Sequence, residues 1–255
     1  MSNRHNIIAT LRAHLEPNPN ILALWLEGAD ATNAVDEYSD LDVCCSVTAG
    51  SLAQVAAQAE QALASLGPLD FKQTLHEEND FQHWVFHLAG TSAYLLVDLT
   101  LFVARGSEFV AGDAIEQPLV LFDKANVVRY VSQQERLTAL GQNQRRQELK
   151  DIVAQVSRLD KYIKRGEFLE AFGYYEKWLL NPLIEGLRMQ YTPLHPDYFI
   201  VHISRHLPSH VLHRLEALFQ VNSVAEIESK QQEALKFFEE TMAALSVDDE
   251  RGAYP

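Results

Sequence analysis

The sequence has few cysteines and no long apolar run. Its only two cysteines, Cys44 and Cys45, are adjacent in an apolar segment. Neighbouring side chains on a strand face opposite sides, so the two thiols cannot easily pair, which favours reduced core thiols. No apolar run approaches the roughly 20 residues that cross a bilayer, and residues 1–20 lack the apolar core and cleavage site of a signal peptide. We therefore expect a cytoplasmic protein with no membrane partner.

Basic residues are also scarce. The chain holds 21 Lys and Arg against 35 Asp and Glu, a formal net charge of −14. A protein that grips a nucleic-acid backbone needs a positive surface, so this charge argues against a nucleic-acid partner and suits a small neutral or cationic one. Acidity that serves only solubility is an equally good explanation. A glycine-rich phosphate loop and a dinucleotide-binding fingerprint are both missing, so phosphate binding by those two routes is unsupported.

The chain has 255 residues, of which 47% are hydrophobic, enough for one large domain or two modest domains with real cores. The pattern changes from strands to helices near residue 130, which predicts one domain at 1–130 and a second at 131–255. In the first we expect helices at 6–15 and 52–66, and strands at 21–26, 41–47, 71–75, 84–88, 92–103 and 119–122. In the second we expect helices at 133–165, 168–191 (kinked at Pro182), 196–206, 209–219 and 224–245. The predicted fold class is α+β: a mixed, α/β-type sheet domain followed by an all-α helical-bundle domain.

The segment between the first two predicted strands carries two nearby acids. Gly28 opens a polar loop after the first strand, and Asp40 and Asp42 lead into the second. Residues two apart on a strand point to the same face, so these carboxylates project together and repel each other. A cation between them relieves the repulsion, and hard carboxylate oxygens suit Mg²⁺. An Asp-x-Asp pair by itself more often marks a solvated turn or a helix cap, and that alternative stays open.

A third acid, Asp98, interrupts the otherwise apolar run 92–103. A lone carboxylate in an apolar strand is costly unless it is paired, hydrogen-bonded or metal-bound. The simpler alternatives are that Asp98 lies at an exposed edge or pairs with Arg105. His83 and His87 could share a strand face near Asp98, and we interpret both as structural.

Gly28-Ala29, a polar spacer and Ser39-Asp40-Leu41-Asp42 form a pattern that resembles a known superfamily. It is the nucleotidyltransferase superfamily, whose core is shared with the β-type DNA polymerases. The branch that the chain resembles is the small antibiotic nucleotidyltransferases, which adenylylate aminoglycosides or lincosamides. Their helical second domain is also similar to residues 158–191 here, at the level of pattern. One departure is Ala29, which stands where the family has a serine that helps to hold phosphates.

The resemblance implies a Mg²⁺-dependent enzyme that moves a nucleoside monophosphate, AMP from ATP, to a hydroxyl of a small molecule. Asp40 and Asp42 would hold Mg²⁺, and Asp98 would complete the metal site or act as general base, a role that a glutamate of the helical domain could also fill. The phosphates would be bound by backbone N–H groups of Gly28 and Ala29, the Ser39 hydroxyl and Lys161.

Two alternatives remain open at this point. Lys161 could simply lie on a solvated helix face. Ala29 leaves room for a catalytically weak or inert member of the fold, which would bind nucleotide, regulate, or act as an antitoxin-like partner. In either case we expect a monomer or homodimer.

Overall fold

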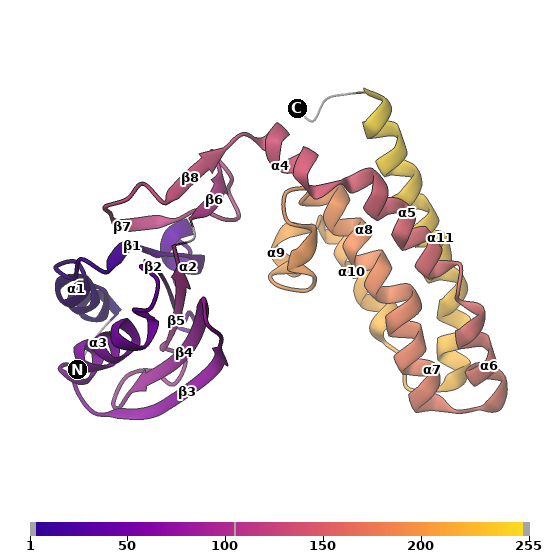
Figure 1. Cartoon of the computed structure of the whole chain (residues 1–255). Helices are drawn as coiled ribbons and strands as arrows, with labels where there is room; N and C mark the ends of the chain where they lie inside the picture. The colour runs from indigo at the N-terminus through magenta and orange to yellow at the C-terminus, as the bar shows by residue number, and fades with distance from the viewer. Residues whose placement is uncertain (1–3, 105, 252–255) are drawn as a thin grey trace. The chain divides into compact units, whose positions relative to one another are not determined.

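The computed structural model describes residues 4–104 and 106–251, the last six of them by their backbone alone. The chain divides into two compact units, Met1–Gln133 and Gln134–Pro255, called the sheet unit and the helical unit below. Figure 1 labels the elements of each unit. A mixed sheet in the first unit and helices in the second confirm the predicted fold class.

Six strands form the main sheet, in the spatial order β3-β4-β5-β2-β1-β7. β2 and β5 run parallel, whereas the other neighbouring pairs are antiparallel. The bounds are β1 Ile21–Leu26, β2 Leu41–Val47, β3 Leu69–Glu77, β4 Phe81–Leu88, β5 Leu96–Val103 and β7 Leu119–Asp123. β1 and β2 have the predicted bounds, and nearly all their side chains are buried, as expected of central strands covered on both faces.

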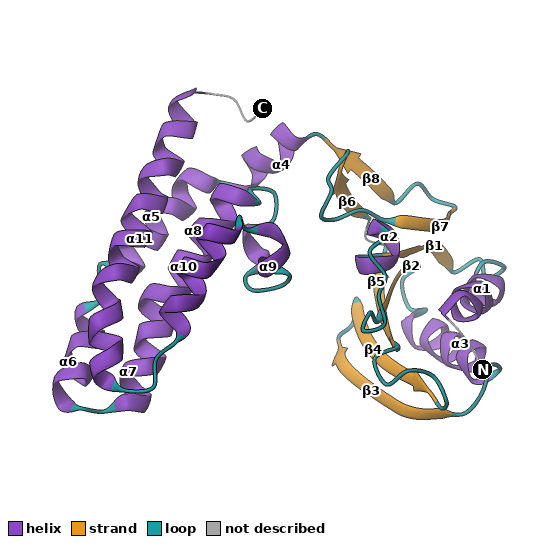
Figure 2. Cartoon of the chain, turned by 180° about the vertical axis from the view of Figure 1, so that it is seen from behind, coloured by secondary structure: helices purple, strands orange, loops and turns teal. Residues whose placement is uncertain are grey.

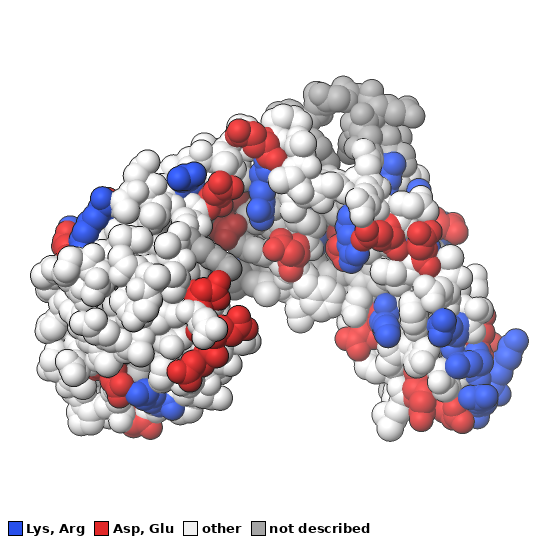
Figure 3. All heavy atoms as spheres, viewed as in Figure 1, with Lys and Arg blue, Asp and Glu red and all other residues white. Residues whose placement is uncertain are grey.

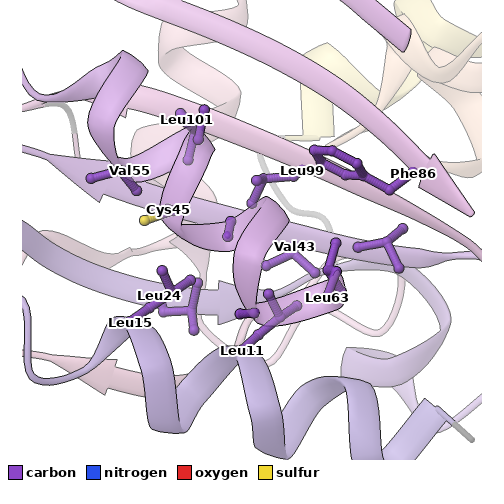
Figure 4. Close-up of a cluster of buried hydrophobic side chains, with 14 of the residues drawn as sticks. Leu11, Leu15, Leu24, Val43, Cys45, Val55, Leu63, Phe86, Leu99 and Leu101 are labelled. Carbon is purple, nitrogen blue, oxygen red and sulfur yellow. The ribbon is translucent and has the colours of Figure 1, made fainter. Parts of the chain in front are cut away.

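One face of the sheet is covered by α1 Arg4–Leu15 and α3 Leu52–Ala64. Figure 4 shows how Leu11 and Leu15 of α1 approach Leu24 and Val43 of the strands. Cys45 also points into this core. The helices therefore bury one complete face of β1, β2 and β5, and a functional site on these strands has to use the other face.

The second face carries a smaller apolar cluster. Trp25 and Cys44 pack there with Phe109 and Val128. The last two belong to a parallel two-stranded sheet, β6 Ser107–Val110 and β8 Val128–Val131, which the sequence analysis did not predict because four-residue strands leave too short a pattern. Cys44 and Cys45 thus lie in clusters on opposite faces, and both thiols are free and buried.

Two further details of the sheet unit differ from the prediction. β5 begins at Leu96, so the predicted strand start at residue 92 was wrong. Residues 92–95 instead form a turn, in which the N–H of Leu95 donates to the carbonyl of Ser92 at 2.9 Å. A short helix, α2 Gly28–Thr32, follows β1 directly, where a loop was expected. It ends at Asn33, whose φ of 56° is left-handed.

The helical unit starts with three helices where the sequence predicted one. They are α4 Gln133–Leu140, α5 Gln142–Val153 and α6 Ser157–Arg165. The first break falls at Gly141, which has a left-handed φ of 57°. The second is a tight turn, in which the N–H groups of Gln155 and Val156 donate to carbonyls three residues back. A period of three and four continues through such turns, so the hydrophobic pattern does not reveal them.

The predicted kink at Pro182 takes the form of a π-helical turn. α7 Phe168–Tyr175 leads into η1 Glu176–Leu180, and α8 Asn181–Tyr191 follows. Proline has no N–H, so the ladder of an α-helix loses a donor at Pro182. A π-turn accommodates one extra residue and lies directly before that gap. α7, η1 and α8 pack against α5, α6 and α11 Val224–Arg251, and Figure 2 shows these helices in purple.

The predicted helix at 196–206 was wrong. Pro196–Tyr198 is a 3-10 turn, α9 spans only Ile203–His206, and Phe199 and His202 between them have left-handed φ values of 47° and 53°. The reason is Arg188 of α8, which is fully buried and donates from Nε to the carbonyl of Phe199 at 2.7 Å and from Nη2 to that of Val201. α10 Ser209–Phe219 has the predicted bounds, and α11 is longer than predicted. Within the described residues, no helix is long and apolar enough to cross a bilayer.

Candidate active site

Three acids from two neighbouring strands meet on the sheet face that the helices leave open. Asp40 lies just before β2, Asp42 lies on β2, and Asp98 lies on β5. Since β2 and β5 are parallel and in register, Asp42 stands directly beside Asp98. Each of the three can offer an oxygen within 4.8 Å of the others. The structure thus brings together the three carboxylates that the sequence analysis singled out.

The surroundings of Asp98 rule out one simple alternative, the edge position, and leave the pairing with Arg105 untested. β5 lies between β4 and β2, so Asp98 is not on an edge strand. Arg105 lies outside the described residues. The partner found is His83 of β4, whose Nε2 is 2.6 Å from Oδ1 of Asp98. His83 thus lies beside Asp98, on the strand face where it was expected, whereas His87 pairs with Asp70 through Nδ1 at 2.6 Å.

Burial and nearby negative charges raise the pKa of Asp42. Burial raises its pKa to about 6, and the charges of Asp40, Asp98, Glu27 and Asp30 add to the effect, in that order. Among the described residues, no Lys or Arg forms an ion pair with the carboxylate of Asp42. A bound cation would relieve this repulsion, so the oxygen-only donor set fits a hard divalent ion.

Gly28 is packed against one of these acids. Its φ is +61°, and a Cβ built on it would lie 2.3 Å from Oδ2 of Asp42. The N–H of Glu27 donates to the carbonyl of Asp42 at 3.1 Å, which holds the start of α2 against β2. The first N–H groups of a helix have no partner within the helix, so the backbone at Gly28 and Ala29 has donors to offer beside the acids.

Ser39 is engaged in a turn. Its hydroxyl donates to Oδ1 of Asp36 at 2.8 Å and accepts from the N–H of Asp36 at 2.9 Å. The side chain of Asp36 also accepts from the N–H of Tyr38 at 3.0 Å. Ser39 therefore stabilises the turn that leads into Asp40, and it could bind a phosphate only by giving up Asp36.

Arg4 is a site residue that sequence reasoning missed. From α1 it donates to the backbone carbonyls of Ser39 and Asp40, the latter at 2.8 Å, and pairs with the buried carboxylate of Asp30 on α2. Burial raises the pKa of Asp30 although Arg4 opposes the shift. One guanidinium thus fastens α2 and the turn before Asp40 to α1. Nothing in the local pattern around Arg4 signals contacts with residues so distant in the chain.

Lys161, the predicted phosphate ligand, belongs to α6 of the helical unit. Its ammonium lies over the rings of Tyr162 and Tyr174, at 4.6 and 5.8 Å from their centroids. Arg165 also lies over Tyr162. Figure 3 shows blue basic side chains gathered over the end of the helical unit where α6 and α7 lie.

The mixed sheet, with its Asp-x-Asp pair beside a third acid, has the fold of a nucleotidyltransferase. A family model described as streptomycin adenylyltransferase matches residues 1–251. The chain therefore belongs to the streptomycin adenylyltransferase family and is an adenylyltransferase-type nucleotidyltransferase.

Comparisons with individual proteins give weaker likenesses. The structure of an aminoglycoside 6-adenyltransferase from Bacillus subtilis is similar over 100% of this chain and 94% of that one, with 14% identity and a TM-score of 0.37. That of JHP933 from Helicobacter pylori is similar over 97% of each chain, with 12% identity and a TM-score of 0.29. No curated protein sequence matches the chain significantly.

Proposed function

We propose that this enzyme transfers AMP from ATP, with Mg²⁺, to a hydroxyl of a small antibiotic. The first candidate acceptor is an aminoglycoside such as streptomycin, and the second is a lincosamide. The observation that carries the proposal is the convergence of oxygens from Asp40, Asp42 and Asp98 within 4.8 Å. Family membership supports adenylyl transfer as the reaction.

The proposed binding of Mg²⁺ rests on the carboxylate oxygens of the three acids. Asp40 and Asp42 would hold Mg²⁺, and Asp98 would complete its ligands. Mg²⁺ bound there would offset negative charge on the phosphoryl oxygens and on the leaving pyrophosphate. The raised pKa of Asp42 supports this assignment, because a carboxylate pressed by other acids gains most from a cation.

In the proposed reaction, the acceptor oxygen forms a bond to the α-phosphorus of ATP and the bond to pyrophosphate breaks. The hydroxyl proton passes to an oxygen of Asp98 or to a glutamate of the helical domain. With alanine at position 29 and the Ser39 hydroxyl held by Asp36, phosphate binding falls mainly to the backbone N–H groups of Gly28 and Ala29. Lys161 would bind the pyrophosphate end. In this scheme 1–130 is the catalytic domain and 131–255 supplies the helical half.

Charge distribution supports a cationic acceptor. Residues 1–133 hold 6 Lys and Arg against 17 Asp and Glu, which is a net charge of −11. Residues 134–255 hold 15 against 18, a net charge of −3. Red acidic side chains accordingly outnumber blue ones on the sheet unit in Figure 3. An amine-bearing acceptor would be attracted to the sheet unit by its field. We also propose that the enzyme works in the cytoplasm, where the two free thiols would stay reduced.

The test is release of pyrophosphate from ATP in the presence of aminoglycosides and lincosamides, one at a time, with Mg²⁺. We expect release with at least one acceptor, and its loss in Asp42→Asn. Glu16→Gln is the matched control, because Glu16 follows the end of α1 and, within the described residues, its ion pair is with Arg12 at the surface. Calorimetry with Mg²⁺ and ATP should show binding that Asp42→Asn weakens. If ATP binds but no acceptor releases pyrophosphate, the chain is instead a nucleotide-binding member without transfer activity, as Ala29 allows.

A further inference from the structure

A row of polar side chains crosses the open face of the sheet and ends at the acids. His76 lies on β3, His83 on β4, Asp98 on β5 and Asp42 on β2. These four strands are consecutive neighbours in the sheet. His76 and His83 are partners in the register of β3 and β4, and their rings are parallel within 2° at 6.3 Å between centroids. The row therefore links two histidines to the carboxylate that the proposed function uses as ligand or base.

The contact between His83 and Asp98 is diagonal. The residue opposite His83 on β5 is Thr100, and the one opposite Asp98 on β4 is Val85. Diagonal neighbours on paired strands are about 7–8 Å apart, so only a long side chain that leans along the sheet can reach. Nε2 of His83 reaches Oδ1 of Asp98 at 2.6 Å, and this is the hydrogen bond that His83 makes within the described part of the chain.

The sheet itself does not need this contact. β4 and β5 are already paired in continuous register from Phe81 opposite Phe102 to His87 opposite Leu96. Both side chains are partly exposed, His83 at 25% and Asp98 at 21%, so the pair is not a filler of the core. The hydrogen bond from His83 instead acts on the orientation of Asp98. The negative charge of Asp42, which stands beside Asp98, would otherwise repel the Asp98 carboxylate from the site.

We propose that His83 is a positioning residue for Asp98. By donating from Nε2 to Oδ1, it fixes the orientation of the carboxylate and leaves Oδ2 directed to the site, where a metal ion or the acceptor hydroxyl would meet it. His76 supports the His83 ring from the far side. This inference rests on the proposed function, since it gives Asp98 its orientation for that chemistry. Partners that orient carboxylates and histidines around metal ions change affinity or activity by roughly 10- to 100-fold when removed.

The experiment compares His83→Leu, which removes the donor, with His83→Gln, whose side-chain amide can still donate. The matched control is His87→Leu on the same strand, which breaks a second His–Asp contact of 2.6 Å that does not involve the acids of the site. For each variant, Mg²⁺ affinity is measured by calorimetry, kcat and KM for ATP by pyrophosphate release, and Tm by thermal unfolding.

We expect His83→Leu to weaken Mg²⁺ binding and to lower kcat by roughly 10- to 100-fold, with KM for ATP little changed. His83→Gln should recover most of both quantities, and His87→Leu should match the wild type. The proposal is overturned if His83→Leu binds Mg²⁺ like the wild type, if His83→Gln is as impaired as His83→Leu, or if all losses follow Tm. If no acceptor supports turnover in the wild type, the proposed function fails, and the Mg²⁺ titration still decides the role of His83.

Discussion

Gly28 and Asp42 are packed so closely that not even a methyl group fits between them. A Cβ at position 28 would lie 2.3 Å from Oδ2 of Asp42, and the backbone there has a left-handed φ of +61°. Two separate physical reasons therefore require glycine: the conformation and the carboxylate. The glycine of the motif is therefore required by Asp42, the acid that lies 42 − 28 = 14 positions later in the chain.

The first prediction concerns Gly28→Ala. The left-handed backbone should cost roughly 1–2 kcal/mol of stability, and the methyl group should displace the Asp42 carboxylate and abolish Mg²⁺ binding. Urea unfolding and Mg²⁺ calorimetry measure the two effects. Gly50→Ala is the matched control, because Gly50 also has a positive φ, +78°, with nothing within 4 Å of its Cβ position. Equal loss of stability in both variants with Mg²⁺ binding intact in Gly28→Ala would contradict the packing argument.

The second prediction concerns pH. The pKa of Asp42 is raised from 3.8 to about 6 in the folded protein, so folding favours its protonated form. The stability it contributes is fully present below pH 3.8 and is lost as pH rises through about 6. Without metal, Asp42→Asn should therefore raise Tm relative to the wild type above pH 6 and have little effect at low pH. Mg²⁺ should raise the Tm of the wild type but not that of Asp42→Asn. The same dependence of Tm on pH in Asp42→Asn and the wild type would contradict the raised pKa of Asp42.

A third prediction follows from Arg4. Replacing it with methionine leaves the Asp30 carboxylate, whose side chain is only 7% exposed, without its partner. Loss of a hydrogen bond to a charged, largely buried group costs about 1–3 kcal/mol, and the turn before Asp40 should loosen. Arg12→Met is the control, since Arg12 and Glu16 form an exposed pair that contributes about 0–1 kcal/mol. Urea unfolding measures the stability of both variants. Asp30→Asn alone and combined with Arg4→Met completes a double-mutant cycle, and a coupling energy close to zero would contradict a role for the Arg4–Asp30 pair.

A fourth prediction separates the two interpretations of Lys161. If it binds the pyrophosphate end of ATP, Lys161→Gln should raise KM for ATP and Lys164→Gln should not. Lys164 is a suitable control because it is also an exposed lysine of α6, while the ammonium of Lys161 is the one held over Tyr162 and Tyr174. Steady-state kinetics with varied ATP measures the difference. Equal KM values in both variants would identify Lys161 as part of a solvated helix face.

The parts of the fold that sequence predicted are those with a local cause. β1 and β2 are apolar runs that end at polar turn residues, so their bounds could be predicted. Asp40, Asp42 and Asp98 could be singled out because a charge in or beside an apolar strand needs a partner. α10 has its predicted bounds because Pro208, directly before it, is a local signal for where the helix begins.

The parts that sequence missed have distant causes. The 196–206 segment has a helical pattern, but the Arg188 guanidinium takes two of its carbonyls from another helix. Arg4 and His83 reach the site through side-chain contacts across 15 or more positions of the chain. Neither contact follows from spacing or composition. A single sequence therefore identified the acids but not the residues that hold them in place.

The parallel pairing of β2 with β5 has a consequence for how the enzyme is made. One helix and two strands of the chain separate the two pairing partners, so a nascent polypeptide that has passed Asp42 still lacks Asp98, the third acid of the site. The entropy of closing the loop between the two strands is lost before their pairing contributes any stabilising free energy. Under the proposed function, divalent-ion binding would therefore begin only after Asp98 has been synthesised and β5 has paired with β2.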